Sequence, residues 1–314
     1  MVPNRTTRRK YIRRTAAGAG ALALGGFAST PTAAQPTAVV GETGTITKSQ
    51  TNPNGFARVS FEQSFPEPPV LIMSPASYNG KQPAHPRVRN VTADSFEFQI
   101  EEWDYLDGGH VKEEFHYLAL LEGTYTVGND STQIEAGKLS ANDDYVRSNY
   151  QREFDTTPAV LTQSQTFRGP DPIVSRGDVT NVGFDTRVQE EEAKPMNGRH
   201  VTEAVGYVAF EPAVDTLTTP EGVTNRFEAQ RTPSEVTDEF YRINFEQLYD
   251  ANPLFMAATQ TVHGPDTTEL RYARLGGKKA DVFCEEERSA DDETNHAPEV
   301  VGYLVFDNEG LIYA

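Results

Sequence analysis

The stretch that decides the fold occurs three times, as His110-Val-Lys-Glu-Glu-Phe-His-Tyr117, His200-Val-Thr-Glu-Ala-Val-Gly-Tyr207 and His296-Ala-Pro-Glu-Val-Val-Gly-Tyr303. Each copy has a glutamate three residues after the histidine and a tyrosine seven residues after it, and each leads into an apolar run. A pattern that recurs at long, regular intervals is the signature of internal repeats. Short apolar runs of this kind are typical of strands, so the stretch predicts the last strand of three related β units.

Landmarks upstream of each copy extend the repeat. In every unit an aromatic residue lies eight residues before a proline, a glycine eleven after it and an arginine eighteen after it. The three sets are Phe61, Pro69, Gly80 and Arg87, then Tyr150, Pro158, Gly169 and Arg176, then Phe245, Pro253, Gly264 and Arg271. The starts also match, as Glu42-Thr-Gly, Glu135-Ala-Gly and Glu228-Ala-Gln. We therefore expect repeats at 41–127, 133–213 and 226–314, with a linker at 214–225.

The strand pattern predicts an all-β fold of three tandem antiparallel β-sandwich domains. Short apolar runs alternate with turn residues, and no segment keeps a long 3.6-residue apolar period. The final strand is apolar on both faces. In the third repeat, one face carries Val301, Tyr303 and Val305, and the other carries Val300, Leu304 and Phe306. One face packs inside its own sandwich, so the other needs cover, which a neighbouring repeat could supply.

The first 34 residues are typical of an export signal. Thr7-Arg8-Arg9-Lys10-Tyr11-Ile12-Arg13 is a twin-arginine motif, followed by a mildly apolar stretch at 16–28 and small residues at 32–34. The twin-arginine route exports folded proteins, which predicts an extracellular or cell-surface location. No later stretch reaches the roughly 18 apolar residues of a membrane-spanning helix, so no membrane span is expected.

The charge excludes one class of partner and indicates a high-salt habitat. The net charge is -18, and nucleic-acid binding needs a basic face, so a nucleic-acid partner is not expected. Residues 1–34 hold six of the 28 basic residues and no acidic one, which leaves 22 basic against 46 acidic residues after cleavage, a net of -24. An acidic, lysine-poor surface is typical of a halophile, and an ordinary acidic secreted protein is the alternative. The single cysteine, Cys284, excludes an internal disulfide and is interpreted as a small buried core residue.

Several landmarks of the first repeat resemble the H-type lectin domain, a six-stranded antiparallel sandwich known from snail agglutinins and the C-terminal domains of discoidins. The residues that carry the resemblance are Phe61-x-x-x-Phe65-x-x-x-Pro69-Val-Leu, Arg87-Val-Arg89-Asn-Val-Thr, Phe96, Trp103 and the final Phe115-His-Tyr-Leu-Ala-Leu-Leu. The other repeats match through Phe154-x-x-x-Pro158, Tyr249-x-x-x-Pro253 and their last strands.

The resemblance implies binding of galactose-type sugars at sites between the subunits of a trimer, which three tandem units could form within one chain. A homo-oligomer of the chain is the other arrangement. Trp103 falls at the family's sugar-contacting tryptophan, and Arg87 matches its sugar-binding arginine. Asp104 stands where the best-known members have a histidine, and Glu191 and Glu287 replace the tryptophan in the other repeats.

The chemistry of the residues, apart from the resemblance, also predicts a sugar site centred on Trp103. Trp103 offers a stacking face, Asp104 a hydroxyl acceptor and Arg87 a donor, and Tyr105 follows next in the chain. We expect this carbohydrate-binding site in the first repeat only. The alternative for Trp103 is a partly buried aromatic at a sheet edge.

Two further polar features have open interpretations. The His-x-x-Glu pairs could bind metal, take part in acid–base chemistry or be structural, with each glutamate paired to the arginine of its own repeat. Acidic clusters after the strands could hold Ca²⁺, the only cofactor left open. Its candidate ligands are Glu190, Glu191, Glu286 and Asp291. In a chain this acidic, solvated carboxylates are the default alternative.

These observations favour a secreted carbohydrate-binding, lectin-like protein of a halophile that is not an enzyme and whose partners are glycans or a cell-surface polysaccharide. The alternative is a structural or adhesive surface module that binds protein partners without sugar recognition. A secreted hydrolase is the third hypothesis, although no Gly-x-Ser-x-Gly, His-Glu-x-x-His or phosphate-binding glycine loop occurs.

Overall fold

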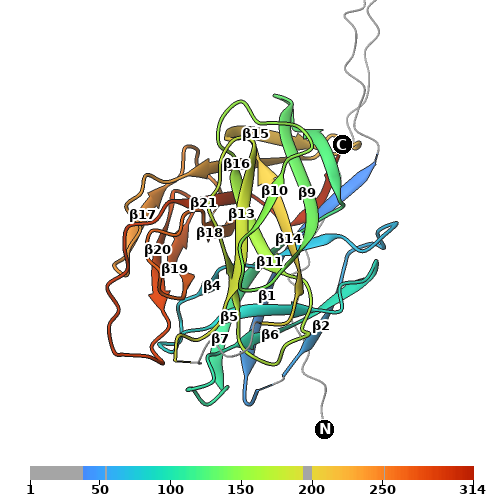
Figure 1. Ribbon diagram of the computed structural model, residues 1–314. Coiled ribbons are helices and arrows are strands. Elements are labelled where there is room, and N and C mark those ends of the chain that lie inside the picture. The colour runs from blue at the N-terminus through green and yellow to red at the C-terminus, as the bar shows by residue number, and fades with distance from the viewer. Residues whose placement is uncertain (1–37, 54, 194–199, 251) are drawn as a thin grey trace, which may run out of the picture.

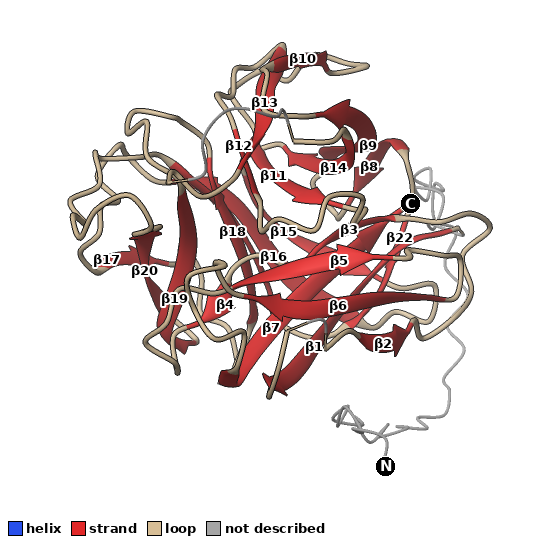
Figure 2. Cartoon of the chain, turned by 60° about the horizontal axis from the view of Figure 1, so that its bottom comes forward, coloured by secondary structure: helices blue, strands red, loops and turns tan. Residues whose placement is uncertain are grey.

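The computed structural model describes residues 38–53, 55–193, 200–250 and 252–314, and these residues form 22 β-strands and no helix (Figure 1). The export signal expected in the first 34 residues lies outside the described residues. Within the described ranges, there is accordingly no helix of the length and apolarity needed to cross a membrane. The predicted all-β class is confirmed, and Figure 2 shows the strands grouped into separate layers.

The first repeat is a sandwich of two antiparallel sheets. One sheet has the order β1-β7-β3 and the other β2-β6-β5. The strands are β1 (Val39–Gln50), β2 (Ala57–Ser60), β3 (Val70–Ile72), β5 (His85–Arg89), β6 (Ser95–Glu101) and β7 (His110–Leu120). The quoted His-to-Tyr stretch therefore opens β7, the central strand of its sheet.

The other two repeats follow the same order. The second contains β9 (Thr132–Ala141), β10 (Val146–Asn149), β11 (Ala159–Ser164), β12 (Val174–Arg176), β13 (Gly183–Gln189) and β14 (Glu203–Phe210). The third contains β16 (Thr224–Arg231), β17 (Tyr241–Asn244), β18 (Leu254–Thr259), β19 (Thr268–Gly276), β20 (Lys279–Glu286) and β21 (Val301–Phe306). Their sheets run β9-β14-β11 over β10-β13-β12, and β16-β21-β18 over β17-β20-β19.

The segments between repeats are strands, which corrects the expected linker. Residues 214–225 form most of a hairpin, because β15 (Ala213–Thr218) pairs with β16 from Ala213–Ala229 to Thr218–Thr224. Likewise β8 (Gly123–Val127), expected in the first repeat, joins the sheet of the second through β9, and β22 (Gly310–Tyr313) pairs with β1. The physical reason is burial: these strands place Val127, Leu217 and Ile312 in a shared core.

Each repeat also has its own core between its two sheets. The largest of these is built around Phe96, Phe98 and Phe115 of the first repeat, and that of the third contains Cys284, fully buried as expected. In β21, Val301, Tyr303 and Val305 point into the third repeat's own core. Alternation along the strand predicted that these three residues share one face, and the structure shows that this face is the inner one.

The other face of each final strand packs into a core that all three repeats share. Leu118 and Leu120, Val208 and Phe210, and Leu304 and Phe306 meet there, with the rings of Phe227 and Phe306 stacked at a centroid distance of 5.8 Å. Burying one such side chain contributes roughly 1.5–3 kcal/mol. A single repeat would leave this face open to water, so the three repeats stabilise one another. A short parallel bridge between β4 (Ala76–Ser77) and β19 adds a backbone link from the first repeat to the third.

Candidate functional site

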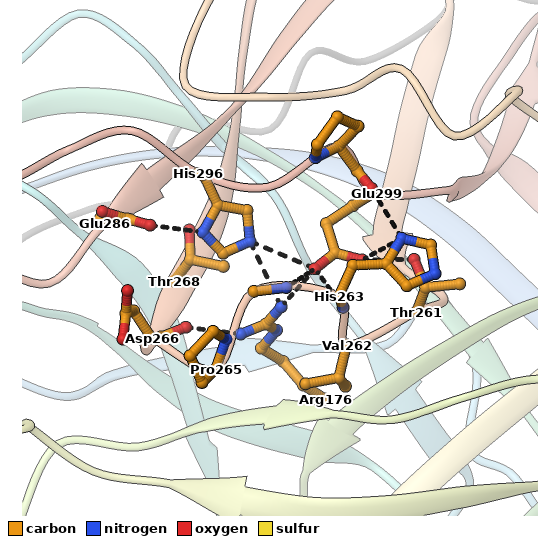
Figure 3. A network of polar contacts seen from close by, with 12 residues as sticks. Arg176, Thr261, Val262, His263, Pro265, Asp266, Thr268, Glu286, His296 and Glu299 are labelled. Atoms are coloured by element: carbon orange, nitrogen blue, oxygen red, sulfur yellow. Dashed lines mark hydrogen bonds and ion pairs between the residues drawn. The ribbon is translucent and has the colours of Figure 1, made fainter.

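The most regular polar feature is a buried carboxylate that receives five donors (Figure 3). Glu299, two residues before β21, is fully buried. It accepts hydrogen bonds from Arg176 Nη2 at 2.9 Å, from the backbone N–H of His263 at 2.9 Å and Gly264 at 3.1 Å, and from the Thr261 hydroxyl. His296 Nε2 lies 3.3 Å from the same carboxylate. Arg176 belongs to the second repeat, so this network joins two repeats.

The same network recurs around the other two glutamates. Glu203 binds Arg87 Nη2 at 2.9 Å, and Glu113 binds Arg271 Nη2 at 3.1 Å. The three ion pairs therefore run in a cycle, from the first repeat to the second, the second to the third and the third to the first. This corrects the expectation that each glutamate pairs with the arginine of its own repeat. Sequence spacing brings the two into the same repeat, but packing around the shared core places the arginine against the next one.

The histidine of each motif bridges two carboxylates. Its Nε2 faces the motif's own glutamate. Its Nδ1 faces a second glutamate, which lies at the end of β6, β13 or β20 or directly after that strand. The Nδ1 partners are Glu102 for His110, Glu190 for His200 and Glu286 for His296. Burial alone would lower the pKa of His110 and His200, but the carboxylates outweigh it and raise both values. An imidazolium between two carboxylates balances part of the buried negative charge.

The glutamates are held ionised by their donors. Burial alone would raise the pKa of Glu203, but hydrogen bonds from His200, Thr166 and two backbone N–H groups lower it to about 2. The pKa of Glu113 and of Glu299 is lowered for the same reasons. Since the carboxylate oxygens already receive several donors and both imidazole nitrogens face carboxylates, we interpret the network as architectural.

The glycine landmark belongs to this network. A Cβ at Gly169 would lie 2.6 Å from His200 Cε1, and equivalent contacts of 2.6 Å and 2.8 Å would arise at Gly80 with His110 and at Gly264 with His296. These distances are too short for any side chain. The glycine lets the histidine ring lie flat against the backbone whose N–H binds the glutamate. The sequence marked the position, but only the packing shows why glycine stands there.

Within the part of the chain that the structure describes, the candidate metal ligands fall into two groups at equivalent places. Asp171, Glu190 and His200 form one group, and Asp266, Glu286 and Glu293 form the other, each with potential ligand atoms within 4.8 Å of one another. Glu191 and Asp291, also expected as candidates, lie outside both groups. Glu191 instead accepts a hydrogen bond from the backbone of Tyr105, and Asp291 from that of Glu293.

The expected sugar-binding residues lie where the first repeat meets the other two. Trp103 is 1% exposed, and its indole N–H donates to Glu269 Oε2 of the third repeat at 3.1 Å. Arg87 is fully buried in the cyclic network. Asp104 is exposed, and Tyr105 is 40% exposed with its hydroxyl accepting from Arg288 N–H. The ring of Trp103 is thus covered by protein, so the expected open stacking face is absent at this residue. Burying an indole with a satisfied N–H favours the interface instead.

A small cavity with polar and apolar walls lies where the three repeats meet, beside Trp103. His85, Val174 and Glu269 line it from equivalent positions in the three repeats. About 50 Å³ is open to the centres of water-sized molecules, enough for a few waters. Among the described residues no group bonds to His85 Nδ1 or Glu269 Oε1, both buried. Burial and the neighbouring Glu285 raise the pKa of Glu269 well above its ordinary value.

Two clusters of aromatic and guanidinium groups lie on the seams between repeats. In the Phe240 cluster, Phe240 is 45% exposed, its ring lies 6.1 Å from Tyr78 of the first repeat, and Arg274 stacks over it at 4.5 Å. Phe283 completes that cluster, 4.9 Å from both rings.

The Phe56 cluster lies on the seam between the first and second repeats. Phe56 lies 5.4 Å from Phe167, and Arg89 stacks over Phe56 at 3.6 Å. At the equivalent place in the second repeat, Arg187 stacks on Tyr145, which is 48% exposed. The sequence held a signal for all three, since Phe56, Tyr145 and Phe240 each stand thirteen residues before a landmark proline.

Comparisons with known proteins give one finding. No protein-family model matches the chain, and no solved structure matches it. Among curated proteins, the chain is similar to halomucin from Haloquadratum walsbyi (strain DSM 16790 / HBSQ001), with 32% identity over 269 residues. The similarity takes in 81% of this chain but 3% of halomucin, so the chain spans a small fraction of that protein's length.

Proposed function

We propose that the protein is an exported, non-catalytic carbohydrate-binding module of a halophile, and that the sugar binds at the seams between repeats. The observation that carries the proposal is the Phe240 cluster. A solvent-exposed ring offers an apolar surface against which a sugar packs, and Arg274, stacked over the ring, supplies N–H donors for the sugar's hydroxyl groups. Aromatic faces combined with a few polar groups are the usual composition of such sites.

The location follows from the seam geometry. Tyr78 comes from the first repeat and Phe240 from the third, so the site exists only in the assembled chain. Two of the three seams have an aromatic residue on each side. The third, between the second and third repeats, has Val262 where the other two have Tyr78 and Phe167. We therefore expect the Phe240 and Phe56 clusters to bind more tightly than the seam at Tyr145.

Export to the cell surface is part of the same proposal. It is supported by the twin-arginine motif, the acidic composition and the similarity to halomucin, a protein of a halophile. That similarity also favours a second candidate function. A chain that corresponds to 3% of a long protein could be an adhesive or assembly module that contacts protein partners without sugar recognition.

A glycan array in molar NaCl, followed by calorimetry on the best glycan, tests the proposal. Phe240→Ala should weaken binding about tenfold, because stacking contributes on the order of 1 kcal/mol or more. Leu248→Ala is the matched control, since Leu248 is also exposed, at 57%, in the same repeat. Tyr105→Ala tests the alternative location beside Trp103, where the sequence predicted the sugar site. An array without any bound glycan, or unchanged affinity in Phe240→Ala, would contradict the proposed site.

A further inference from the structure

Two Asn-x-Ser/Thr sequences lie in the described part of the chain, Asn90-Val-Thr92 and Asn129-Asp-Ser131. This tripeptide is the acceptor signal for N-linked glycosylation in exported proteins. Both occupy turns between paired strands, the first between β5 and β6 and the second between β8 and β9. Both asparagines are exposed. The question is which of them a transferase could reach once the chain has folded.

The two asparagines differ in what their amide nitrogens already contact. Asn90 Nδ2 donates to Glu97 Oε2 at 3.0 Å, and the hydroxyl of Thr92 donates to the backbone oxygen of Ser95 at 2.9 Å. The groups that a transferase must engage are therefore tied to the neighbouring strand. In addition, Glu97 is held by Arg89 at 2.8 Å, so its carboxylate is fixed in place.

The hairpin at Asn129 is open by comparison. Among the described residues, none accepts a hydrogen bond from Asn129 Nδ2, and only its Oδ1 is engaged, accepting from the Thr218 hydroxyl at 3.2 Å. Ser131 is exposed as well, and no described group bonds to its hydroxyl. The backbone of the turn is held by Asp215, whose carboxylate accepts hydrogen bonds from the backbone N–H groups of Asn129 and Asp130 at 2.9 Å and 3.1 Å.

We propose that Asn129 is an N-glycosylation site and that it is modified in preference to Asn90. The inference rests on the export that the proposed function includes. The twin-arginine route exports folded proteins, so a transferase outside the membrane meets the turns as the structure has them. Under those conditions the transferase should modify the sequence whose amide nitrogen and hydroxyl group are not already hydrogen-bonded within the protein.

The reaction is a glycosyl transfer from a lipid-phosphate-linked glycan. The Asn129 Nδ2 attacks the anomeric carbon of the first sugar and forms a C–N bond. The bond between that carbon and the phosphate oxygen breaks, and the phosphate leaves with the electron pair. The amide nitrogen loses one proton to the leaving phosphate, so the residue remains a neutral, substituted amide. Ser131, two residues on, is the hydroxyl that the acceptor signal requires.

Peptide mass spectrometry of the protein secreted by a haloarchaeal host tests the proposal. Trypsin cleaves after Arg89, Lys112 and Lys138, so the two sequences fall in separate peptides, 90–112 and 113–138. We expect the second peptide to be heavier by at least one hexose and the first to have its unmodified mass. Asn129→Gln and Ser131→Gly should each return the second peptide to its calculated mass. Glycine suits position 131, where φ is 64°.

The outcomes separate cleanly. Modification at both sequences still places a glycan on Asn129 and removes only the preference. An unmodified 113–138 peptide from secreted protein overturns the inference, whatever is found at Asn90. Failure of export is a different result, since the protein is then found neither on the cell surface nor in the medium, and it would contradict the proposed function. Asn181→Gln, in an exposed turn without a Ser or Thr two residues on, is the control for the effect of substitution on yield.

Discussion

Replacing Glu299 by glutamine removes one charge from the cyclic network and should cost the protein about 3–5 kcal/mol of its free energy of unfolding. The reason lies in what remains around Arg176. Its guanidinium is buried, and among the described residues Glu299 is the only carboxylate paired with it. Its other hydrogen bonds go to neutral oxygens, Gln189 Oε1 at 3.3 Å and the backbone oxygen of Asp266 at 2.7 Å, and His296 Nε2, 3.4 Å away, carries no negative charge. The variant leaves a buried cation without a counter-charge.

The equivalent variants provide matched controls because the other two arginines have a second carboxylate. Arg87 keeps Glu101 at 3.4 Å, and Arg271 keeps Glu285. Glu203→Gln and Glu113→Gln should therefore cost less, about 1.5–3 kcal/mol each, the usual contribution of a hydrogen bond to a charged group.

Urea unfolding at constant molar NaCl, followed by far-UV circular dichroism, measures all three variants against the parent. The comparison is valid where the slope of free energy against urea is the same in all four proteins. Equal losses in the three variants, or a smaller loss in Glu299→Gln than in the other two, would refute the idea that the second carboxylate makes the difference.

Three further predictions follow from the same contacts. Glu203 has a folded-state pKa of about 2, below its ordinary value of 4.5, so its stabilising contribution is present above pH 4.5 and is lost as pH falls towards 2. The stability difference between the parent and Glu203→Gln should therefore be constant above pH 4.5 and narrow below it; a difference that does not change down to pH 3 would contradict the lowered pKa. Gly169→Ala should lower the melting temperature because its Cβ would lie 2.6 Å from His200, whereas Gly276→Ala, with no atom within 4 Å of the added Cβ, should not. The melting temperature of the parent should rise with NaCl up to molar concentration, because salt screens the net charge of -18; a flat salt response would remove the argument for a halophile.

The sequence alone was enough to predict the β class and the last strand of each repeat. That information is local: turn residues, apolar runs and the spacing from Pro69 to Arg87 recur in each unit, and a local pattern is visible without knowing what packs against it. The two-faced apolarity of the last strand also predicted that each sandwich needs a partner, and the shared core provides one.

The tertiary structure decided which residues meet across repeats. Arg87 and Glu203 are 116 residues apart, and their contact depends on how the first repeat is seated on the second, which no spacing within a repeat records. The same holds for Trp103, whose indole N–H finds Glu269 some 166 residues on, so a residue that resembles a sugar contact is buried at a seam. Strand pairing fixes which residues are neighbours within one sheet. The contacts between repeats form only when the three apolar faces are buried together in the shared core. The way the repeats then pack determines that Phe240 is left exposed to solvent.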